Sequence, residues 1–528
     1  MRSYEDFVKI LGSVFKRDDV RGKWGSELDG EVAWHLGCAF VKILRPNSDA
    51  PAPRIVVGRD MREGSPEMAA QLIRGIRAAG GTVDNVSMCG SEMIYFLTGE
   101  KAGRYAGGAM VTASHNPPEY AGVKFVKSGA EPLSSDQLRK LKEKTARSYA
   151  LHLQDALRGF ERSDETAEFV EKLLNVSGLA GCRKQAKLKV VVEAGNGMGG
   201  VTFRPVAESL KELVQGIEFV FSDENPDGRF PVCTPNPLLD SYISMVRYRV
   251  EKEKADLGIC FDGDADRAGF VDDQGNLIDA SLVSIILFKM LAPRPSDDIR
   301  VMGNLNSSIR LVDFVNDHIK PPADGEKGLI MTPVGHAKIK GLMRAWPQIS
   351  PNSRVLFASE HSGHYFYPDF FYADSGMTTA LFMIRYALEN ITENTTLSGM
   401  LSSLGQECFA SGEENTEFDD DNETIDKIKE VAEEYATLPW RGIVADPDMG
   451  IHKVKTFAAD EPYDHTKLAA LDLRVDSEPG TTPQWWFSVR KSGNEPKLRL
   501  NVESIDENKM REIRDKLLGI IRTRSGKK

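Results

Sequence analysis

The sequence predicts an α/β protein with three related α/β domains, whose mixed sheets are covered by helices, and a smaller C-terminal α+β domain. Three stretches, starting at Arg54, Leu188 and Ile299, share one order: an apolar β-rich run, a small or polar loop, and a helical period. The chain has 528 residues, which suits three or four domains of about 100–200 residues each. The last part of the chain lacks this pattern and is therefore assigned to a domain of another kind.

The first stretch, RIVVGRDMREGSPEMAAQLIRGIRAAGG, illustrates the pattern. Its continuous apolar run is typical of a strand buried on both faces, as in parallel or mixed sheets. Ile73, Ile76 and Arg77 follow helical spacing, and Gly80-Gly81 predicts the end of the helix. The three stretches lie more than about 100 residues apart, which favours related domains over a short-period solenoid.

The C-terminal region begins with an acidic segment, SGEENTEFDDDNET (411–424), which is predicted to be a solvated linker. A helix is expected at 425–435, strands at 485–490 and 498–504, and a closing helix from Asp506. The expected domains are residues 1–165, 166–290, 291–410 and 411–528.

Composition limits the classes of function. The net charge of -11 argues against non-specific nucleic-acid binding. Six scattered cysteines without a C-x-x-C pair suit a reducing compartment and give no zinc signature. The start lacks the apolar core of a signal peptide, and the longest apolar stretch, 282–291, is too short to span a bilayer. We therefore expect a cytoplasmic protein without membrane or nucleic-acid partners.

The strongest local motif is CFDGDADRAGF, residues 260–270. Asp262, Asp264 and Asp266 alternate along a loop after a strand-like run, and Gly263 permits a tight turn. Three carboxylates without His or Cys suit a hard cation, Mg²⁺ or Ca²⁺.

This loop has two alternative interpretations. An EF-hand needs glycine at the sixth loop position and glutamate at the twelfth, where Arg267 and Asp273 stand. The other alternative is a solvated acidic turn. Arg267 could balance the carboxylates or bind a phosphate.

A second motif, VTASHNPPEY, places Ser114 after a strand-like run and before His115 and Pro117. A hydrolase nucleophile elbow would need G-x-S-x-G, which is absent. A turn built from Ser, Asn and Pro is the alternative.

Two further loops carry polar groups suited to a phosphorylated sugar. In SEHSGHYFYPDFFYADSG (359–376), Glu360, Ser362 and His364 can hydrogen-bond sugar hydroxyls, although two histidines could instead bind a transition metal. In RKSGNEPKLRL (490–500), an arginine, a hydroxyl, an amide and free backbone N–H groups can form a phosphate cradle. The alternative for Arg490 is an ordinary solvated charge.

The glycines Gly195, Gly197 and Gly200, with Asp223 downstream, match a dinucleotide-binding fingerprint. No hydride-transfer site accompanies them, and a tight strand-to-helix turn explains them equally well.

Taken in order, these motifs resemble the α-D-phosphohexomutase family, and within it the phosphomannomutase/phosphoglucomutase type. The likeness runs nearly end to end and includes FKRDDVRGKWGSEL, VVGRDMREGSPEM, VTASHNPPEYAGVKF, DGDADR, TPVGHAKIK and SEHSGH. The aromatic run after His364 is more similar to the mannose/glucose type than to phosphoglucosamine mutase.

The resemblance implies four domains around a central cleft and an isomerase that moves phosphate between the 1- and 6-positions of mannose or glucose phosphate. It implies a phosphoserine enzyme, Mg²⁺, and hexose 1,6-bisphosphate as intermediate and activator, in a monomer or homodimer that binds a small hexose phosphate. A movable C-terminal domain is expected to act as a lid.

The implied catalytic residues are Ser114, His115, Lys124, Arg21 and Arg267. The implied metal ligands are Ser114, Asp262, Asp264 and Asp266. The implied substrate residues are Gly335, His336, Lys338, Glu360, Ser362 and His364. The implied phosphate-binding residues are Arg490, Ser492, Gly493, Asn494 and Arg499.

Three segments depart from the family pattern. Asn306 and Ile309 stand where the family usually has Lys and Arg, with Arg310 one place on. Gly493-Asn494 replaces the usual Asn-Thr or Gly-Thr, and Ser359 replaces glycine. Phosphoglucosamine mutase, a phosphosugar phosphatase and a non-catalytic sugar-phosphate sensor remain alternatives.

Overall fold

The computed structural model describes residues 3–45, 50–149, 161–162, 164–292, 298–319, 328–405, 407–435, 438, 440–446, 451–457, 470–477, 484–492 and 496–523. The chain divides into two compact units, residues 1–279 with 362–401 and residues 280–361 with 402–528.

The first unit begins with a mixed sheet. Along the sheet the strands follow the order β1 (Val20–Lys23), β5 (Tyr120–Lys127), β4 (Gly107–Val111), β2 (Arg54–Arg59), β3 (Thr82–Met88) and β7 (Glu161–Arg162), with β6 (Glu131–Pro132) beside β5. Strand β2 runs parallel to β3 and β4, whereas β5 is antiparallel to both β4 and β1. The strands β2 and β4 are buried along most of their length, as their apolar sequences predict.

Helices cover both faces of this sheet. One face packs against α1 (Tyr4–Val14), α2 (Gly30–Leu44), α3 (Ser65–Ala78) and α5 (Ser135–Ser148) in a single apolar core. The other face carries α4 (Ser91–Glu100), which contacts β2 and β4. Helix α3 ends before Gly80, whose φ of 86° confirms the predicted stop.

The second sheet of this unit has the order β12 (Leu277–Ile278), β11 (Ala268–Asp272), β10 (Leu257–Phe261), β8 (Lys184–Glu193) and β9 (Val214–Ser222). Helix α8 (Asp240–Glu253) packs on one face through Val246 and Val250, and α7 (Gly199–Leu213) places Phe203 against Phe219 and Phe261. The unit is completed by α6 (Thr166–Ser177), the hairpin of β16 (Tyr365–Tyr367) and β17 (Ala373–Asp374), with its 3-10 turn at Pro368–Phe370, and by α12 (Gly376–Asn390) and α13 (Leu397–Leu401).

The second unit starts with three parallel strands, β14 (Leu329–Thr332), β13 (Ile299–Asn304) and β15 (Arg354–Ser359), of which β13 is central. The helices are α9 (Ala280–Leu291), α10 (Ile309–His318) and α11 (His336–Ile349). The apolar stretch 282–291 lies in α9. Within the described parts of the chain, no helix is long and apolar enough to cross a membrane.

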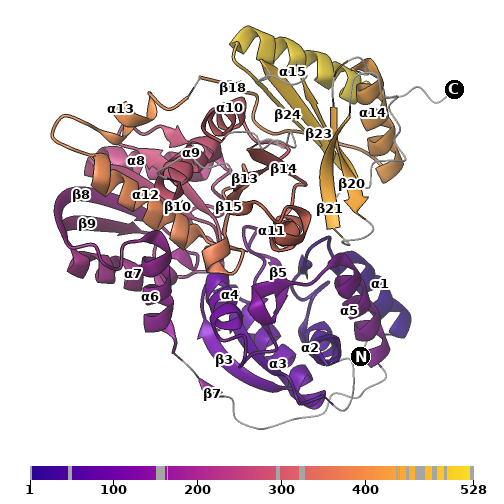
Figure 1. Ribbon diagram of the computed structural model, residues 1–528. Coiled ribbons are helices and arrows are strands. Elements are labelled where there is room, and N and C mark those ends of the chain that lie inside the picture. Colours follow the sequence, from indigo (N-terminus) through magenta and orange to yellow (C-terminus); the bar gives the residue numbers. More distant parts are fainter. Residues whose placement is uncertain are drawn as a thin grey trace. The chain divides into compact units, whose positions relative to one another are not determined.

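An antiparallel sheet ends the second unit (Figure 1). Its order is β18 (Phe409–Ala410), β24 (Lys497–Ser504), β23 (Trp485–Lys491), β22 (Ala470–Asp476), β20 (Trp440–Asp446) and β21 (Ile451–Phe457), and β19 (Glu414–Glu417) also pairs with β24. Helices α14 (Asp421–Glu434) and α15 (Glu507–Arg522) bury Ile428 and Leu517 in a common core with Phe487 and Leu500.

The prediction that 411–424 is a solvated linker is wrong in part. Glu414–Glu417 form β19, and Asp420 caps α14 through the backbone N–H groups of Asn422 and Glu423. An edge strand tolerates charged residues because one of its sides stays in solvent.

The predicted strand–loop–helix units are confirmed as β2–α3, β8–α7 and β13–α10, and the predicted helix and two strands of the C-terminal sheet are confirmed as well. The four predicted domain boundaries stay predictions.

Candidate functional site

Ser114 lies in a tightly constrained loop that follows β4. Its φ of 52° is left-handed, a backbone conformation that a residue with a side chain adopts only at a cost. The Ser114 N–H donates to Thr112 Oγ1 at 2.9 Å, and Ser114 Oγ donates to Asp262 Oδ2 at 2.9 Å. The hydroxyl is thus buried and aimed at the acidic loop.

Arg62 holds this serine loop in place, and the sequence analysis missed it. The fully buried guanidinium donates to the carbonyl oxygens of Ser114, Asn116 and Pro117 at 2.7, 2.6 and 2.6 Å. The only local signal was an arginine shortly after an apolar strand, which does not reveal partners more than 50 residues away.

The acidic loop connects β10 to β11 and approaches the serine loop closely. A Cβ on Gly263 would lie 2.3 Å from the Ser114 carbonyl oxygen, so only glycine fits there. Asp262, Asp264 and Asp266 are at most 1% exposed, and one oxygen from each lies within 4.8 Å of the others.

These carboxylates fit a divalent cation. Asp264 Oδ1 is buried without a hydrogen-bond partner among the described residues, which leaves it available as a ligand. Carboxylate oxygens are the ligands that Mg²⁺ and Ca²⁺ prefer. The same group contains no thiolate or imidazole, in keeping with a hard cation.

Lys124, on β5, supplies positive charge inside this acidic group. Its ammonium donates to Asp264 Oδ2 and Asp266 Oδ2 at 2.6 Å each, and its side chain is 8% exposed. Burial alone would lower the pKa of Lys124, but Asp264 and Asp266, followed by Asp262, raise it above its usual value. In this arrangement Lys124 is a charged counter-ion.

The aspartates differ in their affinity for protons. Burial, with the charges of Asp264 and Asp266, raises the pKa of Asp262 well above its usual value. Burial also acts to raise the pKa of Asp264, yet Lys124 and the Ser91 hydroxyl, which donates at 2.6 Å, bring it below the usual value.

Three further basic side chains lie beside Ser114. His115 Nδ1 lies 3.1 Å from Ser114 Oγ and accepts a hydrogen bond from the Arg267 guanidinium. Burial and then the charge of Arg267 lower the pKa of His115 well below its usual value, so the imidazole is neutral. Arg21, on β1, donates to Asn116 Oδ1 at 2.7 Å and pairs with Asp19.

The loop at 359–376 divides between the two units. His364 Nε2 lies 3.7 Å from Asp266 Oδ1 and 3.6 Å from Asp374 Oδ2, and its Nδ1 lies 3.0 Å from Ser362 Oγ. These three buried residues, Asp266, His364 and Asp374, could together also hold a metal ion. Glu360 belongs to the second unit.

In the second unit Glu360 lies at the end of β15. Its Oε1 accepts from the Gly335 N–H at 2.9 Å and from Asn304 Nδ2 at 3.2 Å. Gly335 has a φ of 128° and precedes α11, which begins with His336 and carries Lys338 in its first turn. Within the second unit, Glu360 thus lies against the Gly335–Lys338 turn.

The departures from the family pattern have local partners. Asn306 Oδ1 accepts from Ser488 Oγ at 2.6 Å, and the Ile309 N–H donates to Glu503 at 2.7 Å. Ser359 Oγ accepts from Ser284 Oγ at 2.9 Å, so the extra side chain is matched by a hydroxyl on α9. The contacts of Asn306 and Ile309 join the β13–α10 loop to the C-terminal sheet. The expected movable C-terminal lid stays a prediction.

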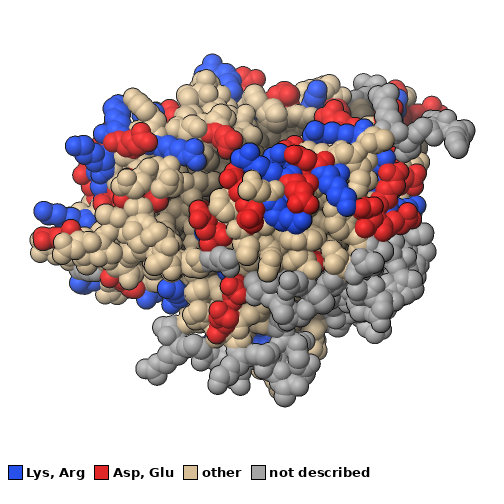
Figure 2. All heavy atoms as spheres, turned by 90° about the horizontal axis from the view of Figure 1, so that it is seen from above, with Lys and Arg blue, Asp and Glu red and all other residues tan. Residues whose placement is uncertain are grey.

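The predicted phosphate cradle contains Arg490 on β23 and Arg499 on β24, which face each other across the two strands. The carboxylate of Glu413 lies between them, at 2.8 Å from Arg490 and 2.7 Å from Arg499. Ser492 is buried, whereas Gly493 and Asn494 lie outside the described residues. Figure 2 shows Lys and Arg side chains interspersed with Asp and Glu on the face that it presents.

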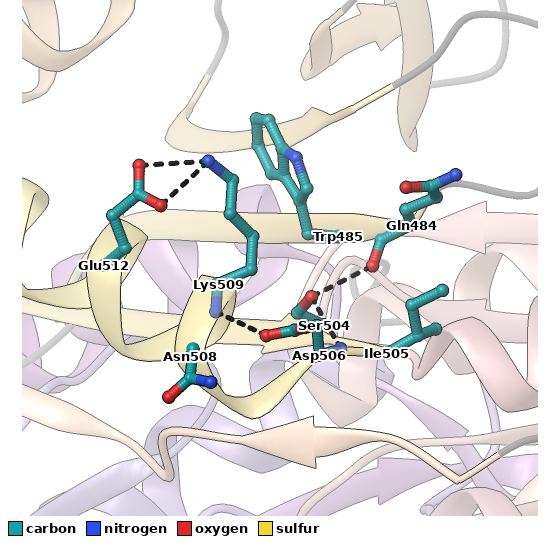
Figure 3. A pocket seen from close by; sticks show the side chains of 8 residues that line it. All are labelled: Gln484, Trp485, Ser504, Ile505, Asp506, Asn508, Lys509 and Glu512. Carbon is teal, nitrogen blue, oxygen red and sulfur yellow. Dashed lines mark hydrogen bonds and ion pairs between the residues drawn. The ribbon is translucent and has the colours of Figure 1, made fainter.

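A separate hollow lies at the start of α15 (Figure 3). Its polar side chains bind one another: Lys509 Nζ contacts both Glu512 oxygens at 3.0 Å, and Asp506 caps the helix through the Lys509 N–H. None of the predicted site residues lines it.

The glycines of the dinucleotide fingerprint are explained by packing. A Cβ on Gly200 would lie 2.2 Å from the Glu224 carbonyl oxygen, and one on Gly197 would lie 2.9 Å from that of Gly263. The second contact helps to position the acidic loop. The structure therefore accounts for these glycines as a tight strand-to-helix turn.

Comparison with known proteins adds independent evidence. Residues 12–151, 167–275 and 281–407 match the phosphoglucomutase/phosphomannomutase alpha/beta/alpha domains I, II and III, and residues 481–520 match the C-terminal domain of that family. The phosphomannomutase of Escherichia coli K12 is 30% identical over 509 residues, which cover 96% of this chain and 98% of the relative. The phosphohexose mutases of Xanthomonas campestris pv. campestris (strain B100) are 31% identical over 494 residues, covering 93% of this chain and 95% of the relative.

Solved structures share the fold. A phosphoglucomutase/phosphomannomutase family protein from Burkholderia thailandensis superposes with a TM-score of 0.75 at 24% identity, covering 100% of this chain and 99% of that one. An N-acetylphosphoglucosamine mutase from Aspergillus fumigatus, solved with GlcNAc-6P and magnesium, gives a TM-score of 0.52 at 13% identity, with 99% of each chain covered. The chain therefore belongs to the phosphoglucomutase/phosphomannomutase family and is a phosphohexomutase, an isomerase.

Proposed function

We propose that this phosphohexomutase transfers a phosphoryl group reversibly between the 1- and 6-positions of a hexose phosphate, mannose or glucose phosphate or both. The observation that carries the proposal is the buried Ser114 Oγ, 2.9 Å from Asp262 in a group of three carboxylates suited to a divalent cation. The names of the curated relatives support this substrate class.

Ser114 is proposed to carry the phosphoryl group in the resting enzyme. Asp262, Asp264 and Asp266, with phosphorylated Ser114, would hold Mg²⁺, which when bound neutralises the negative charge of the phosphoryl group. The A. fumigatus mutase was solved with magnesium, which supports the choice of ion. Arg21 and Arg267, both close to Ser114, would bind the oxygens of the transferring group.

A basic group must accept the proton of the attacking sugar hydroxyl. Lys124 is the first candidate, but three carboxylates hold its proton in the arrangement described above. Neutral His115, whose Nδ1 lies 3.1 Å from Ser114 Oγ and accepts a hydrogen bond from Arg267, is the second candidate. We therefore propose that His115 assists Lys124 in this role.

The bond changes balance without another reactant. The Ser114 Oγ–P bond breaks as the sugar O–P bond forms, and the proton of the sugar hydroxyl passes by way of the basic group to Ser114 Oγ. The product is a hexose 1,6-bisphosphate. After this intermediate turns around, its other phosphate returns to Ser114 and the isomeric hexose monophosphate leaves. Bisphosphate added in trace amounts would phosphorylate free enzyme and so act as an activator.

The second unit is proposed to bind the rest of the substrate. Arg490, Ser492 and Arg499, with Gly493 and Asn494, would bind the distant phosphate. The proposed sugar-reading residues of this unit are Gly335, His336, Lys338 and Glu360, and those of the first unit are Ser362 and His364. Hydrogen bonds to hydroxyls that look alike in both orientations would allow one site to serve both half-reactions.

A coupled assay of mannose 1-phosphate, glucose 1-phosphate and glucosamine 1-phosphate, with Mg²⁺ and a trace of the bisphosphate, tests the proposal. We expect turnover of mannose or glucose phosphate, and at least about 10³-fold less with Ser114→Ala because the phosphate acceptor is lost. Ser128→Ala removes the hydroxyl of a 3-10 turn that follows β5 and donates to Ala102 O, and it is the matched control.

Each alternative has its own signature in this assay. Preferential turnover of glucosamine 1-phosphate would identify a phosphoglucosamine mutase. Release of inorganic phosphate without isomerisation would identify a phosphatase. Equal turnover by Ser114→Ala would contradict the assignment of the phosphoserine.

A further inference from the structure

Glu413 occupies the position between the two arginines of the proposed phosphate cradle. Arg490 and Arg499 are directly opposed on β23 and β24, so their side chains lie on the same face of the sheet. Glu413 accepts from Arg490 Nη2 with one carboxylate oxygen at 2.8 Å and from Arg499 Nη1 with the other at 2.7 Å. A single carboxylate thus bridges two guanidinium groups.

The backbone aims Glu413 at the arginines. On one side of it Ala410 pairs with Glu503, and on the other Glu414 pairs with Leu500, so the segment has one residue more than β24 opposite it. Gly412, with a φ of 70°, allows this bulge, and Ser411 anchors it through hydrogen bonds with Val502 at 2.8 and 3.0 Å. Bulges of this kind commonly redirect a side chain next to a binding site.

Glu413 is ionised in this position. Burial acts to raise its pKa, but the charges of Arg490, Arg499 and His361 outweigh burial and lower the pKa below its usual value. The carboxylate therefore neutralises part of the repulsion between two arginines that face each other.

We propose that Glu413 is an internal competitor of the substrate's distant phosphate for Arg490 and Arg499. This inference rests on the proposed function, because it assigns the turn-around of the bisphosphate to that phosphate site. Two carboxylate oxygens make with these arginines the contacts that two oxygens of a phosphate would make. A phosphate that binds must take these N–H groups from Glu413, and Glu413 can take them back.

This competition lowers the affinity of the cradle for the distant phosphate. One phosphate of the hexose bisphosphate must dissociate from the cradle before the other phosphate can reach Ser114. A side chain that recaptures the arginines makes release easier at the expense of ground-state affinity, which raises KM but speeds the turn.

Direct binding measurements test the competition. Calorimetric titration of the full chain, carrying Ser114→Ala to prevent turnover, with inorganic phosphate and with glucose 6-phosphate would compare Glu413 with Glu413→Gln. We expect about tenfold tighter binding with Glu413→Gln, which corresponds to one charge-assisted hydrogen bond no longer lost on binding. Glu413→Ala should act in the same direction.

Glu417→Gln is the matched control. Glu417 lies on β19, four residues from Glu413, and its substitution by Gln removes the same charge. Its side chain is 81% exposed and pairs with Lys497 at 3.2 Å. Because it does not contact either cradle arginine, its substitution should change phosphate affinity less than twofold.

Steady-state kinetics in the Ser114 enzyme give the second readout. Glu413→Gln should lower KM and kcat together, by about tenfold and severalfold respectively, and should release less bisphosphate per turnover. If Glu413 only held the two arginines in place, Glu413→Gln would instead raise KM, because less ordered arginines bind phosphate less well.

Unchanged or weaker phosphate binding with both Glu413 variants would overturn the inference, whether or not the enzyme isomerises sugars. If binding tightens as expected while the unsubstituted enzyme turns over no hexose phosphate, the competition stands and the proposed function fails.

Discussion

The acidic group in the first unit and the arginine pair in the second carry opposite charges. In both, a side chain of the opposite sign lies among the like charges. Two carboxylates, those of Asp264 and Asp266, bind the ammonium of Lys124, and two guanidinium groups bind the carboxylate of Glu413. Each group of like charges thus contains one counter-ion from its own chain. Without such a counter-ion, repulsion between the like charges would lower the free energy of unfolding.

The two groups differ in their contact with water. Asp264 and Asp266 are at most 1% exposed and Lys124 is 8% exposed, whereas the side chains of Arg490, Glu413 and Arg499 are 11%, 24% and 32% exposed. Water can replace a lost partner in the second group but not in the first. The comparison therefore predicts unequal costs for removing the two counter-ions.

The largest effect is expected from removal of divalent cations. Chelation should lower isomerase activity at least about 100-fold, because the charge of the transferring phosphoryl group would not be neutralised. Added Mg²⁺ should restore the activity of the unsubstituted enzyme but not of Asp264→Asn. Full activity in excess chelator, measured by the coupled assay, would show that the acidic group serves only Lys124.

Substitution Lys124→Met should cost about 3–5 kcal/mol of unfolding free energy without added metal, because it leaves buried carboxylates without their cation. Urea unfolding followed by circular dichroism measures this loss, and Mg²⁺ or Ca²⁺ should recover part of it. Lys127→Met, on the same strand, is the control: Lys127 pairs with Glu131 at 2.6 Å near the surface and should cost at most about 1 kcal/mol. Equal losses for the two variants would contradict the role of Lys124 as counter-ion.

Glu413→Gln should cost only about 1 kcal/mol in the same unfolding experiment, because partly exposed arginines regain water and neutral glutamine can still accept a hydrogen bond. Its effect on phosphate affinity should therefore exceed its effect on stability. A loss as large as that of Lys124→Met would mean that the two groups do not differ in the way that exposure suggests.

The smallest effect is expected for Ser359→Gly, which restores the usual family residue. It removes an uncharged hydrogen bond with Ser284, worth about 0.5–1.5 kcal/mol, and should leave KM for hexose phosphate within twofold. A change in urea midpoint without a change in slope would report this loss, whereas a large change in KM would show that Ser359 helps to position Glu360.

The sequence alone determined the local elements and the chemistry-bearing loops. Apolar runs followed by helical periods predicted β2–α3, β8–α7 and β13–α10, because these patterns depend on neighbours a few residues apart. The three alternating aspartates could be recognised for the same reason. The prediction of a linker at 414–417 is wrong because the partner strand, β24, pairs with these residues across 80 to 86 residues of chain.

Which charged side chains meet depends on how distant segments pack. Arg62 and Lys124 reach the serine and acidic loops from other strands and segments, and Glu413 reaches two arginines through a bulge. No spacing in the sequence encodes these contacts, since they depend on sheet order and strand register. Composition and motif therefore fixed the kind of chemistry, while the packing of distant segments chose the counter-ion for each group of like charges.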